Sequence, residues 1–404
     1  MIFNLEVIFW LSIFIIFYSY IGYGVLLYLL VNIKRRFFDN HSEEHQENYE
    51  PQVTLFVPAF NEKEFVSRKV ANSRSLDYPA EKVQQIWVTD GSDDGTPDLL
   101  RMYQDVEVYH IPERKGKIAA MNRGMQFVKT PIVIFSDANT ELSKQSIREI
   151  VKLFSKEKVG CVSGEKRIYN KSADAAAGAG EGLYWKYESQ LKKWDAELCS
   201  VVGAAGELFG IRTHLWQEVE PDTLLDDFII SLRIAMSGYT IQYSSEAYAM
   251  ESASADIHEE IKRKIRISAG GIQSIVRLRS LLNVFKYRTL SFQYISHRVL
   301  RWILTPLLLL LVIPINIFLA LDEGLFHFEI YNMLLLGQIL FYTLSLIGWL
   351  LERKELRLKA LFVPYYFFIM NLSVYLGFIR YMKRDQSVNW ERARRGDLNS
   401  SAEI

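Results

Sequence analysis

The segment VQQIWVTDGSDDGT (residues 83–96) contains the repeating unit of the fold: an apolar run rich in β-formers, an acid at its end, and a polar loop that leads into a helix. The same order recurs on both sides of it, with strands expected at 53–60, 106–111 and 131–137 and helices at 63–75, 117–128 and 144–154. Strands that alternate with helices require crossover connections. The sequence therefore predicts an α/β fold whose mostly parallel sheet is covered by helices on both faces.

Two of the expected strands end on an aspartate, Asp90 and Asp137. Ligands of such sheets bind beyond the carboxyl ends of the strands, so these carboxylates suit a site for a metal ion and a phosphate-bearing ligand. The loop PAFNE after the first strand lacks the glycines of a dinucleotide-binding fingerprint, and the chain has no P-loop motif. The run DGSDDG is similar to a calcium loop, but its twelfth position is Arg101 instead of glutamate. An Asx-type turn that caps the next helix is an alternative role for this run.

Four stretches carry no Asp, Glu, Lys or Arg, at 7–33, 302–321, 330–351 and 360–379. Each is long enough to cross a hydrocarbon core of about 30 Å. Lys34, Arg35 and Arg36 follow the first stretch, whereas the short loop between the second and third stretches contains acids and no Lys or Arg. The positive-inside rule therefore predicts that the chain between the first and second stretches lies in the cytoplasm. The expected location is that of an integral protein in a bacterial-type cell membrane.

The fourth stretch conflicts with this topology. Four crossings leave the C-terminal tail outside, yet the tail is rich in Lys and Arg, which favours the cytoplasm. Pro364 and Asn371 lie within the stretch, and a broken or re-entrant segment with a cytoplasmic tail is the interpretation that resolves the conflict.

Charge and cysteine content exclude other classes of protein. The chain has 47 basic and 47 acidic residues, so it lacks the basic excess of a nucleic-acid binder. Its two cysteines are too few for a disulfide framework. The segment 262–301 is basic and has no acid, and beyond about residue 275 apolar and basic residues interleave as in a helix that lies on a membrane surface.

Six motifs carry a family resemblance: VPAFNE (57–62), VTDGSDDGT (88–96), RKGKIAAMNRG (114–124), FSDANT (135–140), GAAGELFGIR (203–212) and LLDDFIISLRIAMSGY (224–239). In this order and spacing the chain resembles family 2 glycosyltransferases, above all the membrane-embedded cellulose, chitin-oligosaccharide, hyaluronan and poly-N-acetylglucosamine synthases. The resemblance implies a GT-A fold. It also implies an enzyme that moves a sugar from a nucleoside diphosphate, usually UDP, to an acceptor hydroxyl with inversion at the anomeric centre.

The resemblance assigns the nucleotide site and the metal. Residues implied to bind the nucleotide are Ala59, Phe60, Glu62, Asp90, Lys117 and Asp137. Mg2+ or Mn2+ would be held by Asp137 and Asn139, where the family often has Asp-x-Asp. An amide oxygen can ligate a hard cation without contributing charge, so more of the binding would come from the diphosphate. For Lys117, an ordinary lysine at a helix start is the alternative.

The resemblance also assigns the chemistry. Asp227 corresponds to the general base, with a role in complementing the helix dipole as the alternative. Arg263 and Arg266 would bind the diphosphate, and Glu207 and Asp226 are candidate acceptor contacts. Processive members carry Gln-x-x-Arg-Trp, which reads RKIRI (263–267) here. The lost Gln and Trp argue against processive synthesis and leave transfer of one sugar or a short oligomer.

We therefore expect a UDP-sugar-dependent glycosyltransferase that extends a glycan or glycolipid in polysaccharide or glycoconjugate synthesis. A transferase that places one sugar on a lipid-phosphate carrier and an inactive scaffold subunit that binds a nucleotide sugar are the alternatives. Membrane lipids are expected partners and nucleic acid is not, and a homo-oligomer or a partner subunit is left open. The expected division is a transmembrane anchor (1–33), a juxtamembrane linker (34–50), a GT-A domain (51–273), basic interfacial helices (274–301), a second transmembrane region (302–381) and a polar tail (382–404).

Overall fold

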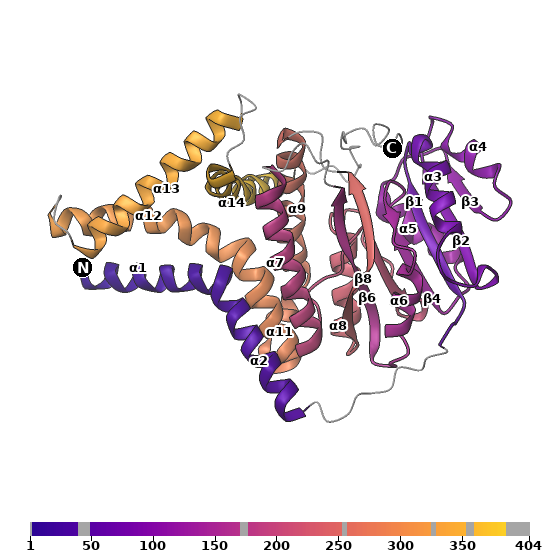
Figure 1. The fold of residues 1–404 in the computed structure, drawn as a ribbon, viewed down its shortest axis with the longest axis horizontal. Helices are drawn as coiled ribbons and strands as arrows, with labels where there is room; N and C mark the ends of the chain where they lie inside the picture. Colours follow the sequence, from indigo (N-terminus) through magenta and orange to yellow (C-terminus); the bar gives the residue numbers. More distant parts are fainter. Residues whose placement is uncertain are drawn as a thin grey trace.

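The computed structural model describes residues 2–38, 49–169, 177–252, 257–324, 329–352 and 359–384. A β-sheet flanked by helices forms one end of the molecule, and long helices that include the N-terminus project from the other (Figure 1). The helices α7 (Ala177–Leu198), α9 (Ile257–Arg277) and α14 (Lys359–Lys383) lie between these two parts. The tail 385–404 and most of the predicted linker lie outside the described residues.

The sheet has eight strands in the order β3-β2-β1-β4-β7-β6-β8-β5. Their bounds are β1 Val53–Ala59, β2 Val83–Asp90, β3 Glu107–Ile111, β4 Ile132–Ser136, β5 Glu141–Leu142, β6 Val159–Tyr169, β7 Leu208–Arg212 and β8 Thr240–Ser252. Four of the seven pairings are parallel, and the antiparallel ones involve β7 and β5. The prediction of a mostly parallel sheet is confirmed. The strands from β5 onward were not predicted, because their polar and glycine-rich sequences lack a continuous apolar run.

Helices cover both faces of the sheet, as predicted. Helices α3 (Lys63–Arg74), α4 (Thr96–Arg101) and α6 (Ser146–Leu153) pack on one face, and α5 (Lys117–Gly124) and α8 (Asp226–Met236) pack on the other. Strand β1 supplies both cores, since Leu55 and Val57 point to the first face and Phe56 to the second. This alternation is the two-residue period of a strand whose faces are both buried.

The core beside α8 continues into the membrane-side helices, which are the helices between the sheet and the long apolar segments. Ile275 of α9 and Tyr294 of α11 (Thr289–Tyr294) belong to the same buried cluster as Phe56 and Phe228. The short helix α10 (Val284–Tyr287) precedes α11, and its Phe285 is 91% exposed. The sheet and the first turns of the long helices therefore share one hydrophobic core.

Three helical segments of the described chain, Ile2–Phe37, Thr289–Glu323 and Ile330–Glu352, are long and apolar enough to cross a membrane. The first consists of α1 (Ile2–Phe17) and α2 (Tyr23–Phe38), joined by a π-helical turn over Tyr18–Gly22. In the second, a π-helical segment (Ile295–Leu304) leads into α12 (Thr305–Glu323). The third is α13 (Ile330–Glu352).

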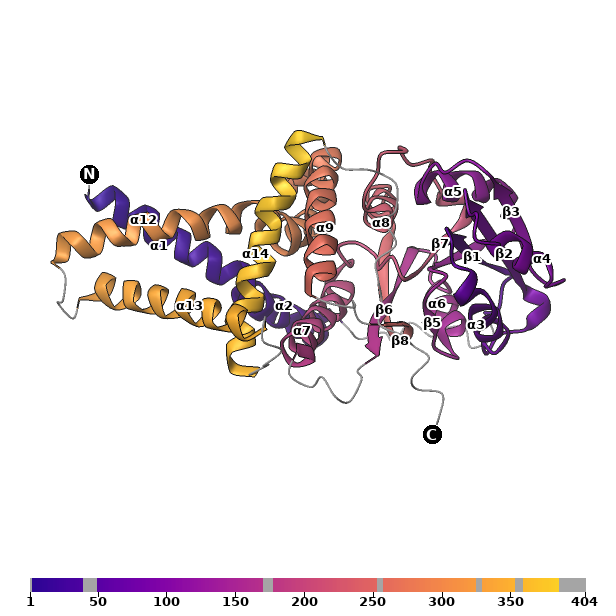
Figure 2. The same ribbon diagram turned by 90° about the horizontal axis from the view of Figure 1, so that it is seen from above.

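The fourth apolar stretch forms α14. This helix is continuous through Pro364 and Asn371, so the interpretation as a broken segment is wrong. It runs crosswise to α1, α12 and α13 and packs against α9 (Figure 2). A Cβ on Gly377 would lie 2.9 Å from the carbonyl oxygen of Ile265, which shows how closely the two helices approach.

Candidate active site

A cavity of about 160 Å³ opens beside the carboxyl end of β4. Its walls come from the start of α5, the loop before β7, the start of α8 and the middle of α9. The lining includes seven of the predicted site residues: Lys117, Asp137, Glu207, Asp226, Asp227, Arg263 and Arg266. Five separate stretches of sequence therefore converge on one site.

Lys117 lies between two carboxylates in this cavity. Its Nζ is 2.9 Å from Asp137 Oδ1 and 3.4 Å from Asp226 Oδ2, and all three side chains are at most 16% exposed. Burial opposes the charge of the lysine, but the two carboxylates outweigh it and hold the pKa of Lys117 above its usual range. Lys117 is thus a fixed cation on the cavity wall, more than an ordinary lysine at a helix start.

Asp227 lies in the first turn of α8, next to Asp226. Burial in the cavity wall, together with the neighbouring charge of Asp226, raises the pKa of Asp227 to about 7. A helix N-terminus on its own would favour the ionised form and lower the pKa. The carboxyl is therefore more than a partner for the helix dipole, and its pKa matches that of a general base at neutral pH.

The arginines of α9 make one wall of the cavity basic. Arg266 forms no ion pair or hydrogen bond with the residues the structure describes, and burial and the neighbouring Arg263 lower its pKa. Arg263 Nη1 lies 3.6 Å from carboxylate oxygens of Glu251 and Glu260. A partly buried guanidinium that faces a cavity beside a second cation favours a bound anion, and the charge of a diphosphate would meet this need.

Glu207 is held in an ion-paired cluster. Its Oε1 lies 2.7 Å from Lys166 Nζ, and Lys166 also contacts Glu251. Although burial opposes it, Lys166 and Arg263 keep the pKa of Glu207 below its usual range, so this wall residue stays ionised. Lys166 and Glu251 were missed in the sequence because β6 and β8, which carry them, were not predicted.

The residues predicted to contact the base lie at the neighbouring strand ends and do not line the cavity. Asp90 Oδ2 accepts hydrogen bonds from the backbone N–H groups of Lys115 (2.8 Å) and Gly116 (2.6 Å), immediately before Lys117. The other oxygen, Oδ1, has no hydrogen-bond partner among the described residues and lies 3.6 Å from Arg123 Nη1. One loop therefore joins Asp90 to the cavity, and Oδ1 is available as an acceptor.

The other residues predicted to contact the base lie in the loops around Asp90. Ala59 is buried at the end of β1, and the guanidinium of Arg114 lies 3.7 Å over the ring of Phe60. The backbone N–H of Glu62 donates to Thr96 Oγ1. Asp94 forms the Asx-type turn expected within this run, since its Oδ1 accepts from the N–H of Thr96 at 2.9 Å, and Gly95 is the N-cap of α4.

The donor atoms present can hold a divalent cation only in part. No group of three or more His, Cys, Asp or Glu suited to a metal ion occurs within the described ranges. Asp137 lines the main cavity, whereas Asn139 lines a separate, smaller one with Lys69. Mg2+ and Mn2+ prefer oxygen ligands, and Mg2+ commonly uses one or two carboxylates plus substrate phosphates. The site therefore fits an ion held at Asp137 and chiefly by a bound diphosphate.

Gln273 lies on α9, C-terminal to the position of the missing Gln of the processive motif. Its side chain binds the backbone of the loop before α8 instead of lining the cavity, since Oε1 accepts from Leu224 N at 3.0 Å and Nε2 donates to Asp222 O at 2.8 Å.

Comparison with known proteins identifies the family of the sheet-containing domain. Residues 54–217 match the family model for glycosyl transferase family 2. The chain is 25% identical over 221 residues to beta-monoglucosyldiacylglycerol synthase of Trichormus variabilis, which is 50% of this chain and 45% of that protein. It is 20% identical over 389 residues to "Probable glycosyltransferase YdaM" of Bacillus subtilis, which is 90% of this chain and 92% of that protein. The chain thus spans about half the length of the first relative and most of the second.

A solved structure confirms the fold. The mannosyltransferase PcManGT of Pyrobaculum calidifontis, in complex with GDP-Man and Mn2+, matches with a TM-score of 0.70 over 95% of this chain and 100% of that chain, at 19% identity. The chain therefore contains a family 2 glycosyltransferase domain with a GT-A fold, joined to helices long enough to cross a membrane.

Proposed function

We propose that the protein is an inverting glycosyltransferase that moves a sugar from a nucleoside diphosphate to a hydroxyl of a glycolipid or glycan. The observation that carries this proposal is Asp227, a carboxyl with its pKa raised to about 7 in a cavity that Arg266 also lines. The carboxyl suits a base and the guanidinium suits a diphosphate. A scaffold that only binds a nucleotide would gain nothing from a carboxyl with this pKa.

The reaction is a single displacement. The acceptor oxygen attacks the anomeric carbon, the bond from that carbon to the diphosphate oxygen breaks, and Asp227 takes the acceptor proton. Lys117 and Arg266 stabilise the charge on the departing diphosphate. A divalent cation bound at Asp137 would neutralise more of this charge. Asp90 Oδ1 accepts a hydrogen bond from the base of the nucleotide.

We propose that the site faces the cytoplasm. Three crossings, with α14 lying along the membrane surface, place the start of α1 and the end of α14 on opposite sides of the membrane. The basic residues at the end of α2 and at the end of α14 are then on the same side as the active site, in agreement with the positive-inside rule. A protease that removes a tag after residue 404 only from the external face would contradict this topology.

One experiment can identify both the sugar donor and the acceptor. Membranes that contain the protein are incubated with radiolabelled UDP- and GDP-sugars and Mg2+ or Mn2+, with diacylglycerol, polyprenyl phosphate or an oligosaccharide as acceptor, and Asp227→Asn is the control. We expect a UDP-sugar to label a lipid-extractable product that carries one or a few sugars. Labelled polyprenyl phosphate would favour the lipid-carrier alternative, and no transfer from any donor by folded protein would favour the scaffold.

A further inference from the structure

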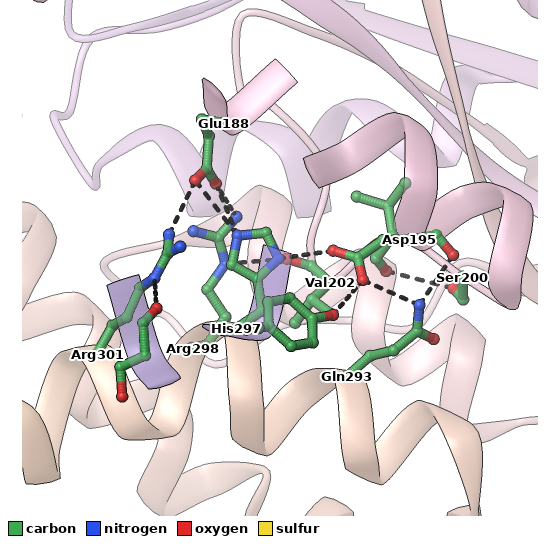
Figure 3. Close-up of polar contacts among 11 residues, drawn as sticks. Glu188, Asp195, Ser200, Val202, Gln293, His297, Arg298 and Arg301 are labelled. Atoms are coloured by element: carbon green, nitrogen blue, oxygen red, sulfur yellow. Dashed lines mark hydrogen bonds and ion pairs between the residues drawn. The ribbon is translucent and has the colours of Figure 1, made fainter. Parts of the chain in front are cut away.

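A buried polar cluster joins the membrane-side helices to the catalytic domain (Figure 3). Its acids, Glu188 and Asp195, lie on α7, and its bases, His297, Arg298 and Arg301, lie on the π-helical segment before α12. Glu188 pairs with all three bases, at 2.9 Å from Arg298 and 3.2 Å from both Arg301 and His297. The other ring nitrogen of His297 lies 2.6 Å from Asp195 Oδ2.

The cluster is internally matched in charge and donors. Each ring nitrogen of His297 faces a carboxylate oxygen of α7. Gln293 donates to Asp195 Oδ1 at 3.0 Å, and Tyr23 donates to the same oxygen. Buried charges persist only when they are paired, so any shift of the π-helical segment along α7 would leave a charge uncompensated. The cluster therefore fixes one register between these two elements.

Arg298 extends from this cluster to the active-site loop. Its Nη2 pairs with Glu188 Oε1, and its Nε donates to the carbonyl oxygen of Val202 at 3.2 Å. Val202 directly precedes Gly203, the start of the loop that brings Gly206 and Glu207 to the cavity wall.

The same loop is hydrogen-bonded, through Ser231, to the backbone of Asp227. The N–H of Ala204 donates to Ser231 Oγ at 3.0 Å, and this hydroxyl donates to the carbonyl oxygen of Asp227 at 2.6 Å. Gly203 has a φ of +90°, and a Cβ there would lie 2.3 Å from the ring of Phe228. A Cβ on Gly206 would lie 3.2 Å from Asp227 Oδ2. Little room therefore separates this loop from the base.

A second contact leads from the π-helical segment to the other side of the base. The ring of Trp302 lies 5.3 Å from that of Phe228, the residue after Asp227. The guanidinium of Arg298 lies 5.5 Å from the Trp302 ring. Both neighbours of the catalytic carboxyl, the loop and Phe228, thus rest on one turn of a membrane-side helix.

We propose that Arg298 is a positioning residue for Asp227: clamped by Glu188, it holds the Val202 carbonyl and thereby keeps the 203–207 loop closed over the catalytic carboxyl. This role rests on the proposed glycosyltransferase function. It makes the first turns of the second membrane segment part of the catalytic apparatus, so that the membrane anchor and the chemistry are mechanically coupled.

The test compares Arg298→Gln and Arg298→Lys with wild type and with Arg101→Gln, an exposed arginine of α4 whose partner is Asp98. Lysine retains a cation for Glu188 but lacks the separate Nε and Nη2 donors, so it tests the hydrogen bond to Val202 in a cluster that keeps its charge. The measurements are kcat, the KM of the donor, the pH dependence of kcat and the Tm of the full-length protein in nanodiscs.

We expect kcat to fall at least about tenfold in both variants while the donor KM changes by less than about twofold, because misplacing a catalytic group acts on the chemical step. An opened loop admits water to Asp227, whose pKa is raised to about 7 by burial, so the acid limb of kcat should move to lower pH. Asp226, Lys117 and Glu207, which also face this carboxyl, are unchanged in the variants. Arg101→Gln should match wild type in all four measurements.

A purely structural role gives a different result. If both Arg298 variants lose Tm but keep the kcat and pH profile of wild type per mole of folded protein, Arg298 does not position the base. If Arg298→Gln does not fold, Arg298→Lys decides alone, and a wild-type pH profile and kcat in that variant overturn the proposal. A wild-type protein without any transferase activity would instead refute the proposed function and this inference with it.

Discussion

Asp227→Asn separates the catalytic value of the carboxyl from its cost to stability. The raised pKa of Asp227, about 7 against an ordinary 3.8, means that ionising this group opposes folding. Below the ordinary pKa the carboxyl is neutral in both folded and unfolded protein, and the charge costs nothing. The penalty grows between the two values and is complete above the folded pKa. A difference of about 3 units corresponds to an upper bound of about 4 kcal/mol.

The amide has the shape of the carboxyl and no charge, so Asp227→Asn removes this penalty and the base together. We expect kcat to fall about 10²- to 10⁴-fold while the donor still binds, because general base catalysis contributes this much. The melting temperature of the variant should exceed that of wild type at about pH 8 and match it at about pH 4. Thermal unfolding in nanodiscs and donor titration give both quantities on one preparation.

Two results would refute the reasoning. Wild-type turnover by Asp227→Asn would remove this residue from the mechanism. An unchanged Tm difference between the two pH values would show that the carboxyl carries no buried-charge penalty, and the raised pKa would then be wrong. In the wild type, kcat should rise with pH through about 7, because the protonated carboxyl cannot accept the acceptor proton.

Three further predictions test the walls of the site. Arg266→Gln should raise the donor KM about 10- to 100-fold through loss of a charge-assisted contact, and a KM equal to that of Arg101→Gln would contradict the diphosphate role. Gly203→Ala should lower the free energy of unfolding more than Gly238→Ala does. Both glycines have positive φ, but only a Cβ at Gly203 would meet a ring, that of Phe228. Equal losses of unfolding free energy in a denaturant titration would exclude a clash between this Cβ and the ring. Removing divalent ions with a chelator should weaken donor binding measured by calorimetry. In Asp137→Asn the chelator should change the donor affinity less than in wild type. A chelator effect in the variant equal to that in wild type would remove Asp137 as a metal ligand.

The first half of the sheet could be predicted because its signal is local. Strand β2 begins and ends at the predicted residues, and β1, β3 and β4 agree to within one or two residues at each end. Each is a short apolar run followed by a polar loop. In contrast, β8 (Thr240–Ser252) mixes polar and apolar residues, and its conformation depends on pairing with β6 across a long separation in sequence.

The membrane part shows a different limit of sequence reasoning. The apolar stretch at 360–379 has the length and composition of a spanning helix, but α14 packs against α9 and runs crosswise to α1, α12 and α13 (Figure 2). The hydrophobicity of a stretch indicates only that its side chains are shielded from water in the folded protein. It does not distinguish lipid from the close approach of another helix, such as that between Gly377 and Ile265.

The sequence by itself determined the class of fold, the acids at the strand ends and the motifs of a family 2 glycosyltransferase, because each of these depends on residues that are close together in the chain. Only the tertiary structure decided that Lys117 is held between Asp137 and Asp226, that Asp227 has a raised pKa, and that Arg298 reaches the loop over it. These properties depend on burial and on distances of a few ångströms between segments far apart in the chain. Electrostatic energies change steeply over such distances, so they arise only once the chain has folded.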